Sequence, residues 1–158
     1  MKLLKNPYRK LDGYDCFGCS ANNPIGLQME FYEDGEELVS RWNPGKHYQG
    51  FQNILHGGIQ ATLMDEIASW TVQIKLKTAG VTSRLNVRYR DKVLVTEKYI
   101  TLRAKITGIR RNLADVDVKL FDSEGRCCAE ASAIYFTFPE EVARKRLNYP
   151  EYEDFYRD

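Results

Sequence analysis

The triplet His56-Gly57-Gly58 and the carboxylate of Asp65 carry the strongest chemical signal in this sequence. A glycine-rich helix start presents free backbone N–H groups and a partial positive charge, which can polarise a carbonyl group. A carboxylate two turns further along the helix can act as a base or a nucleophile. Together these groups could hydrolyse an ester or a thioester. A glycine bend followed by a solvated aspartate is, however, also a common structural pattern.

The spacing of these groups has a consequence for assembly. Gly58 and Asp65 fall on nearly the same face of a helical wheel, but a rise of about 1.5 Å per residue separates them by about 10 Å along the axis. One thioester carbonyl cannot contact both groups. If both act on it they must come from different chains, as antiparallel helices in a two-fold dimer allow. This chemistry therefore predicts a dimer.

One long helix is predicted from Gly57 to about Lys75 to hold these groups. Its apolar residues recur at helical spacing on one face, namely Ile59, Leu63, Ile67, Trp70 and Ile74. Asp65 falls almost opposite the centre of that face, which predicts that its side chain points away from the sheet. A strip of small residues flanks Asp65 on the wheel and would permit the close approach of another helix or a ligand.

Alternating apolar residues predict strands on both sides of this helix. Two short strands are expected at residues 27–31 and 37–42, joined by a hairpin turn at Asp34-Gly35. Four long strands are expected after the helix, at residues 81–90, 97–109, 112–121 and 126–138. Pro139 can begin a short helix that ends before Pro150. The element order predicts an α+β fold in which an antiparallel sheet wraps around the long helix.

Length and charge bound the class of protein. The 158 residues suit one domain, residues 1–158, with an N-terminal extension at 1–22 and a C-terminal helix and tail at 139–158. Lysine and arginine number 23 against 22 acidic residues, so no net charge would draw the protein to nucleic acid or to an anionic membrane. No apolar run has the length of a signal peptide or a membrane span, and a cytoplasmic location is expected. The expected partners are a small molecule and further copies of the chain.

The four cysteines raise the question of a metal site, because Cys16-x-x-Cys19 has a common ligand spacing. Cys127 and Cys128 argue against a four-cysteine site, since adjacent residues on a strand point to opposite faces. A redox role for the first pair lacks the usual strand-to-helix setting. We therefore expect reduced structural thiols, no metal and no cofactor.

Three groups of residues together resemble the hotdog-fold thioesterases of the phenylacetate-degradation (PaaI-like) branch, which are related to 4-hydroxybenzoyl-CoA thioesterase. The groups are Cys16-Phe17-Gly18-Cys19 with Asn23-Pro24-x-Gly26-Leu27, then Leu55-His56-Gly57-Gly58-x-x-x-x-Leu63-x-Asp65-Glu66, then Val81-Thr82-x-x-Leu85-Asn86-Val87-x-Tyr89. They occur in the family's order and span about residues 16–138. The resemblance implies a hotdog fold, a dimer or tetramer whose protomers join their sheets edge to edge, and hydrolysis of acyl-CoA thioesters at the dimer interface.

The resemblance also implies roles for individual residues. Asp65 would be the base or nucleophile, and the Gly57-Gly58 turn would supply the amide that polarises the carbonyl. Thr82 would position the water, and His56 would orient the glycine turn or contact the thioester. The residues expected to bind the substrate are Asn53, Ser83 and Arg84.

Two departures and two alternatives accompany this resemblance. Many relatives have Arg-Pro-Val where this chain has Asp91-Lys92-Val93, and some have asparagine where Gly50 stands. The main alternative is a non-catalytic acyl-CoA-binding or sensor protein of the same fold, which needs no carboxylate at the thioester. A hydratase would place an aspartate a few residues before a histidine, and neither His47 nor His56 has that neighbour. The sequence names no acyl group and does not separate a dimer from a tetramer.

Overall fold

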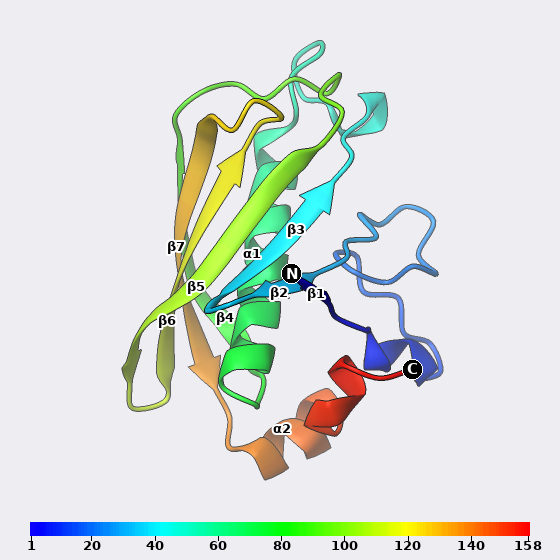
Figure 1. Ribbon diagram of the computed structural model, residues 1–158, viewed down its shortest axis with the longest axis vertical. Helices are drawn as coiled ribbons and strands as arrows, with labels where there is room; N and C mark the ends of the chain where they lie inside the picture. Colours follow the sequence, from blue (N-terminus) through cyan, green and yellow to red (C-terminus); the bar gives the residue numbers. More distant parts are fainter.

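The computed structural model describes residues 1–158 and is built on one seven-stranded sheet (Figure 1). The strands are β1 (Lys2–Leu3), β2 (Tyr32–Asp34), β3 (Glu37–Trp42), β4 (Gly80–Tyr89), β5 (Ile100–Arg110), β6 (Leu113–Phe121) and β7 (Cys127–Thr137). They lie in the order β1-β2-β3-β5-β6-β7-β4, and all neighbours are antiparallel. Because β4 pairs only with β7, its other side is a free edge of the sheet.

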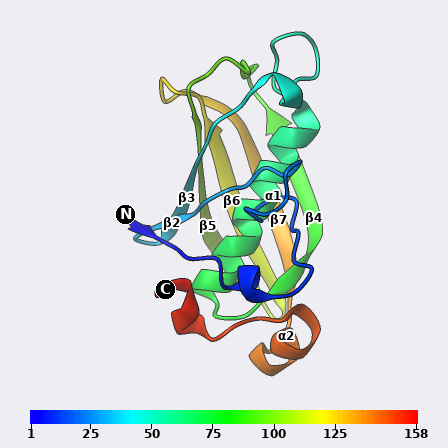
Figure 2. The same ribbon diagram turned by 90° about the vertical axis from the view of Figure 1, so that its right-hand side faces the viewer.

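The long helix α1 (Gly57–Lys75) lies along the inner face of the curved sheet (Figures 1 and 2). Its first backbone hydrogen bond runs from the Gln60 amide to the His56 carbonyl, with 3.0 Å between nitrogen and oxygen. Ten of its 19 residues are buried, and they lie on more than the one face that the sequence pattern identifies. The helix is therefore covered by more than the sheet.

The terminal segments cover the side of α1 that the sheet leaves open (Figure 2). Phe31 stacks on Trp70 of the helix with 4.5 Å between ring centroids, and Phe155 meets Trp70 edge-on at 5.6 Å. The hydroxyl of Tyr149 donates to the Gln73 carbonyl oxygen at 2.7 Å. One core of 34 buried residues joins the sheet, the helix and both ends of the chain. Burial of these aromatic rings, each contributing up to a few kcal/mol, fixes the terminal segments on the helix.

Most predicted elements are confirmed. The helix has the predicted bounds, the strand at 37–42 is β3, and Gly35 turns the chain after β2 with a φ of 60°. The four long strands differ from prediction by at most three residues at either end, the largest difference being the start of β5 at Ile100. The predicted C-terminal helix is α2 (Glu140–Leu147). None of the helices has the length and apolar character that a membrane span requires.

The predicted strand at residues 27–31 is wrong. The alternation there is real, since Leu27, Met29 and Phe31 are all at most 4% exposed. However, Gln28 has a φ of 53°, which breaks an extended strand. The amides of Leu27 and Met29 bond instead to the carbonyls of residues 17 and 18, and the strand β2 begins only at Tyr32. The alternation reflects burial against the helix without pairing in the sheet.

Candidate active site

Asp65 lies in the middle of α1 and is held by two hydroxyl groups from the sheet. The hydroxyl of Thr82 on β4 donates to Asp65 Oδ1 at 2.9 Å, and that of Tyr135 on β7 donates to the same oxygen at 2.5 Å. Thr82 and Tyr135 are register partners across the β4–β7 pair, so their side chains lie on one face of the sheet. The structure therefore brings Asp65 and Thr82 together as the sequence predicts.

The predicted direction of the Asp65 side chain is wrong. The helical wheel directs it away from the sheet, whereas it faces the edge formed by β4 and β7. The wheel fails because the curved sheet also covers the small-residue side of the helix, where Ala68 and Val72 are fully buried. The small residues beside Asp65 thus permit close approach of the chain's own strands.

The hydrogen bonds at Asp65 leave one of its carboxylate oxygens available. Both hydroxyls donate to Oδ1, and Oδ2 has no protein partner. Burial raises the pKa of Tyr135 above its usual range, and the charge of Asp65 raises it further. Tyr135 therefore remains a neutral donor that fixes the carboxylate, while Oδ2 is able to accept a proton.

His56 caps the start of α1 and uses one of the two glycine amides. The Gly58 amide donates to His56 Nδ1 at 2.8 Å. The amides of Gly57 and Ile59, by contrast, have no acceptor within the chain. Within the Gly57-Gly58 turn, the Gly57 N–H is therefore the donor that remains available to a ligand. His56 orients the turn by accepting the hydrogen bond from the Gly58 N–H.

A cavity of about 360 Å³ adjoins this free amide. It is lined by Gly50, Phe51, Ile54, Leu55, His56 and Gly57. Phe51 is 86% exposed, which is unusual for an aromatic side chain without a partner. Tyr89 closes the opposite side of the turn, where its hydroxyl donates to the Gly57 carbonyl at 2.6 Å. The helix start thus combines a free donor with apolar surface.

The three residues expected to bind the substrate lie in two places. Asn53 is exposed in the loop before α1, with a φ of 67°, and its carbonyl accepts from the Val95 amide at 2.9 Å. Ser83 and Arg84 are exposed on β4 beside Thr82, where the pairing with β7 shifts between Thr82 and Arg84. Within one chain the structure forms two separate groups, one at the helix start and one around Asp65.

Sequence reasoning missed Tyr135 and Tyr89, which hold the two groups in place. Tyr135 ends a row of small inward-facing residues on β7 that includes Ala131 and Ala133, all at most 5% exposed. A tyrosine that follows inward-facing alanines at every second position of one strand predicts a buried hydroxyl group that needs a hydrogen-bond partner. Tyr89 is half exposed at the end of β4. It belongs to the third group of residues that carries the resemblance, but the sequence gives it no role.

Comparison with known proteins agrees with this architecture. The sequence profile of the thioesterase superfamily matches residues 52–129, from the loop before α1 to the start of β7. No curated protein matches the chain by sequence. The chain is therefore similar to the thioesterase superfamily over these residues, and its fold is the hotdog fold of the solved thioesterase structures.

Solved structures share the fold at low sequence identity. A thioesterase superfamily protein superposes with a TM-score of 0.66 at 19% identity, over 72% of this chain and 56% of the other. The chain therefore spans little more than half the length of that protein. A hypothetical thioesterase from Streptococcus pneumoniae with coenzyme A superposes with a TM-score of 0.65 at 22% sequence identity, over 71% of this chain and 87% of the other. A Streptococcus mutans protein bound to acetyl CoA has a TM-score of 0.65 at 17% identity, over 71% of this chain and 90% of the other.

Proposed function

We propose that this protein is an acyl-CoA thioesterase whose active site forms between two protomers, without a metal ion in the reaction. The observation that carries the proposal is the Asp65 carboxylate, fixed through Oδ1 by Thr82 and Tyr135 with Oδ2 left open. Related folds that hold coenzyme A or acetyl CoA support an acyl-CoA substrate. A protein that only bound the thioester would need no such carboxylate.

The free edge of the sheet supports an assembly of two chains. Strand β4 runs over ten residues at this edge, with Val81 46% exposed and Tyr89 50% exposed. A long edge strand that carries apolar side chains is a surface on which a second sheet can pair. The Asp65 group lies directly behind this edge, because Thr82 belongs to β4. A partner chain at this edge would meet the Asp65 group.

The separation within one chain supports the same arrangement. Gly57 and Asp65 are eight residues apart on α1, which corresponds to about 12 Å along the helix axis. That distance exceeds the reach of one carbonyl group, whereas two-fold symmetry can bring the helix start of one protomer to the carboxylate of the other. Each dimer would then contain two equivalent sites.

In the proposed reaction, the Gly57 amide of one protomer donates to the thioester carbonyl oxygen and stabilises the negative charge that develops there. Asp65 of the other protomer accepts a proton at Oδ2 from a water molecule, whose oxygen attacks the carbonyl carbon. The tetrahedral intermediate then breaks its carbon–sulfur bond and releases the thiolate and the carboxylic acid. A thiolate is a good leaving group, so the site needs no strong general acid.

The surrounding residues would position these groups and the substrate. Thr82 donates to Asp65 and keeps its oxygen lone pairs available to a water molecule. His56 orients the glycine turn through the Gly58 amide. Asn53 beside the helix start and the exposed Ser83 and Arg84 on β4 would contact the CoA portion or the acyl chain. Their exposure is compatible with a channel that two protomers complete.

A thiol-release assay over short, medium, long and aromatic acyl-CoAs tests the proposed function. We expect the purified protein to release free CoA from at least one of these classes, with activity proportional to enzyme concentration. The same panel defines the acyl group. If every acyl-CoA binds in equilibrium titration but none is hydrolysed, the protein is a non-catalytic acyl-CoA-binding protein and the proposal is wrong.

A further inference from the structure

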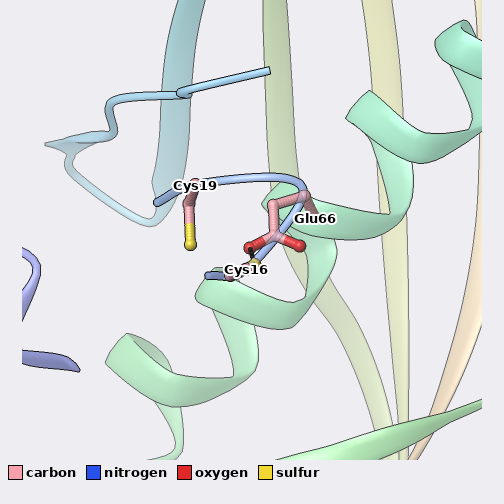
Figure 3. A group of neighbouring side chains, drawn as sticks. All are labelled: Cys16, Cys19 and Glu66. Atoms are coloured by element: carbon pink, nitrogen blue, oxygen red, sulfur yellow. Dashed lines mark hydrogen bonds between the residues drawn. The ribbon is translucent and has the colours of Figure 1, made fainter. Parts of the chain in front are cut away.

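Two cysteines and one carboxylate converge beside α1, next to the Asp65 site. Cys16 and Cys19 lie in a turn of the N-terminal segment, and Glu66 projects from the helix toward them (Figure 3). The two sulfur atoms and a carboxylate oxygen all lie within 4.8 Å of one another. The thiol of Cys16 donates to Glu66 Oε1 at 3.3 Å. We refer to Cys16, Cys19 and Glu66 as the thiol–carboxylate cluster.

The backbone is shaped to hold this cluster together. The turn is closed by a bond from the Ser20 amide to the Cys16 carbonyl at 3.0 Å. Gly18 lies so close to the helix that an added Cβ would stand 2.4 Å from Glu66 Cδ. A side chain at position 18 would therefore displace the Glu66 carboxylate from its place beside the turn. The absence of a side chain at Gly18 lets the carboxylate lie against the cysteine turn.

The cluster carries potential negative charge without a cation. Glu66 takes part in none of the chain's ion pairs. Enclosed anionic groups of this kind are normally paired or bound to a metal.

Two polar groups lie beside the Cys19 sulfur. The hydroxyl of Tyr14 lies 3.0 Å from Cys19 Sγ, and the Asn6 side-chain amide donates to the same sulfur at 3.7 Å. Such outer contacts orient metal-bound thiolates and stabilise their charge. Cys16 is only partly buried, so solvent and ions can reach the cluster.

We propose that the thiol–carboxylate cluster binds a zinc ion. Zinc combines thiolate and carboxylate ligands in tetrahedral sites, with two residues between cysteines a usual spacing. Two sulfur ligands exclude magnesium and calcium, which take oxygen ligands. The three protein ligands leave the fourth position for water on the open side of Cys16.

This site differs from the one that the cysteine count suggests. Cys127 and Cys128 lie on β7 and contribute nothing to the cluster, as the alternation of strand side chains predicts. The third ligand comes instead from the helix. The ion would join the N-terminal segment to α1, next in sequence to the residue proposed to act on the thioester. The zinc proposal does not depend on the proposed thioesterase activity.

Cobalt and zinc titrations of the reduced, metal-free full-length protein test this proposal. Co²⁺ should bind one per chain and give the near-ultraviolet thiolate-to-cobalt band together with the visible bands of a tetrahedral site. Zn²⁺ should then displace it. We expect Cys16→Ser, Cys19→Ser and Glu66→Gln each to weaken binding at least about tenfold, with the thiolate band reduced only in the cysteine variants. Cys127→Ser is the matched control and should bind as the unchanged protein does.

Thermal unfolding gives a second readout. At a free zinc concentration of about 100 times the dissociation constant, the Tm should rise by about 5–10 °C, and Cys16→Ser should abolish the rise. Two results overturn the proposal. One is metal binding that Cys16→Ser and Glu66→Gln leave unchanged. The other is a chain that binds no Co²⁺ or Zn²⁺ after reduction, including one purified with a Cys16–Cys19 disulfide.

Discussion

Asp65→Asn is expected to lower kcat for the preferred acyl-CoA at least about 100-fold, because removal of a general base typically costs a factor of about 100 to 10,000. The substituted amide keeps an oxygen that can accept from Thr82 and Tyr135, so the local structure should persist. It cannot accept the proton of the attacking water. The measurement is steady-state thiol release with saturating substrate.

A matched control separates this effect from a general loss of charge. Asp12→Asn makes the same change at an exposed aspartate in the N-terminal segment and should leave kcat unchanged. Unfolding curves of both variants should match those of the parent protein. Hydrolysis by Asp65→Asn within a few-fold of the parent rate would remove Asp65 from the reaction.

Gly57→Pro is expected to lower kcat by about 100- to 1,000-fold, the usual loss when one donor to a developing oxyanion is removed. The substitution deletes the N–H of the first helical residue, where proline is well tolerated because that amide has no intrahelical acceptor. The preceding residue, His56, has φ −57° and ψ 133°, which are compatible with a following proline. The variant therefore removes the donor while the helix is expected to form.

Gly57→Ala is the control for this prediction. It retains the N–H and adds a Cβ that would lie 3.4 Å from the Tyr89 ring and hydroxyl, an ordinary contact distance. We expect this variant to lose less than about tenfold in kcat, whereas a donor deletion loses far more. Equal losses in Gly57→Ala and Gly57→Pro would show that crowding against Tyr89, and not the amide, explains the effect.

The fold was largely predictable because its elements have clear periods. The helix has apolar residues at helical spacing between a glycine pair and Lys75, and the long strands alternate between turns such as 123–125. The hairpin glycine at position 35 and the proline before α2 mark ends that the structure confirms. Residues 27–31 show the limit of this approach, since alternation reports which side chains are buried and says nothing about backbone partners.

The site was less predictable because tertiary packing determines it. The residue types at Gly57, Asp65 and Thr82 indicate a chemistry, but a wheel drawn for one face cannot anticipate a sheet that curves around the helix. The same limit hid the contact of Glu66 with the cysteine turn, because 50 residues separate Cys16 from Glu66. Only the folded chain shows which hydroxyls and thiols reach the two adjacent carboxylates.

Subunit mixing tests the central claim, that one site uses the Gly57 amide of one protomer and the Asp65 carboxylate of its partner. The inactive Gly57→Pro and Asp65→Asn chains are unfolded together, refolded as an equal mixture and assayed for thiol release. Random pairing places both variants in half of the dimers, and each mixed dimer contains one intact site of two. The account predicts recovery of about one quarter of the parent activity. A mixture that is no more active than either variant alone, although mixed dimers have formed, would contradict it.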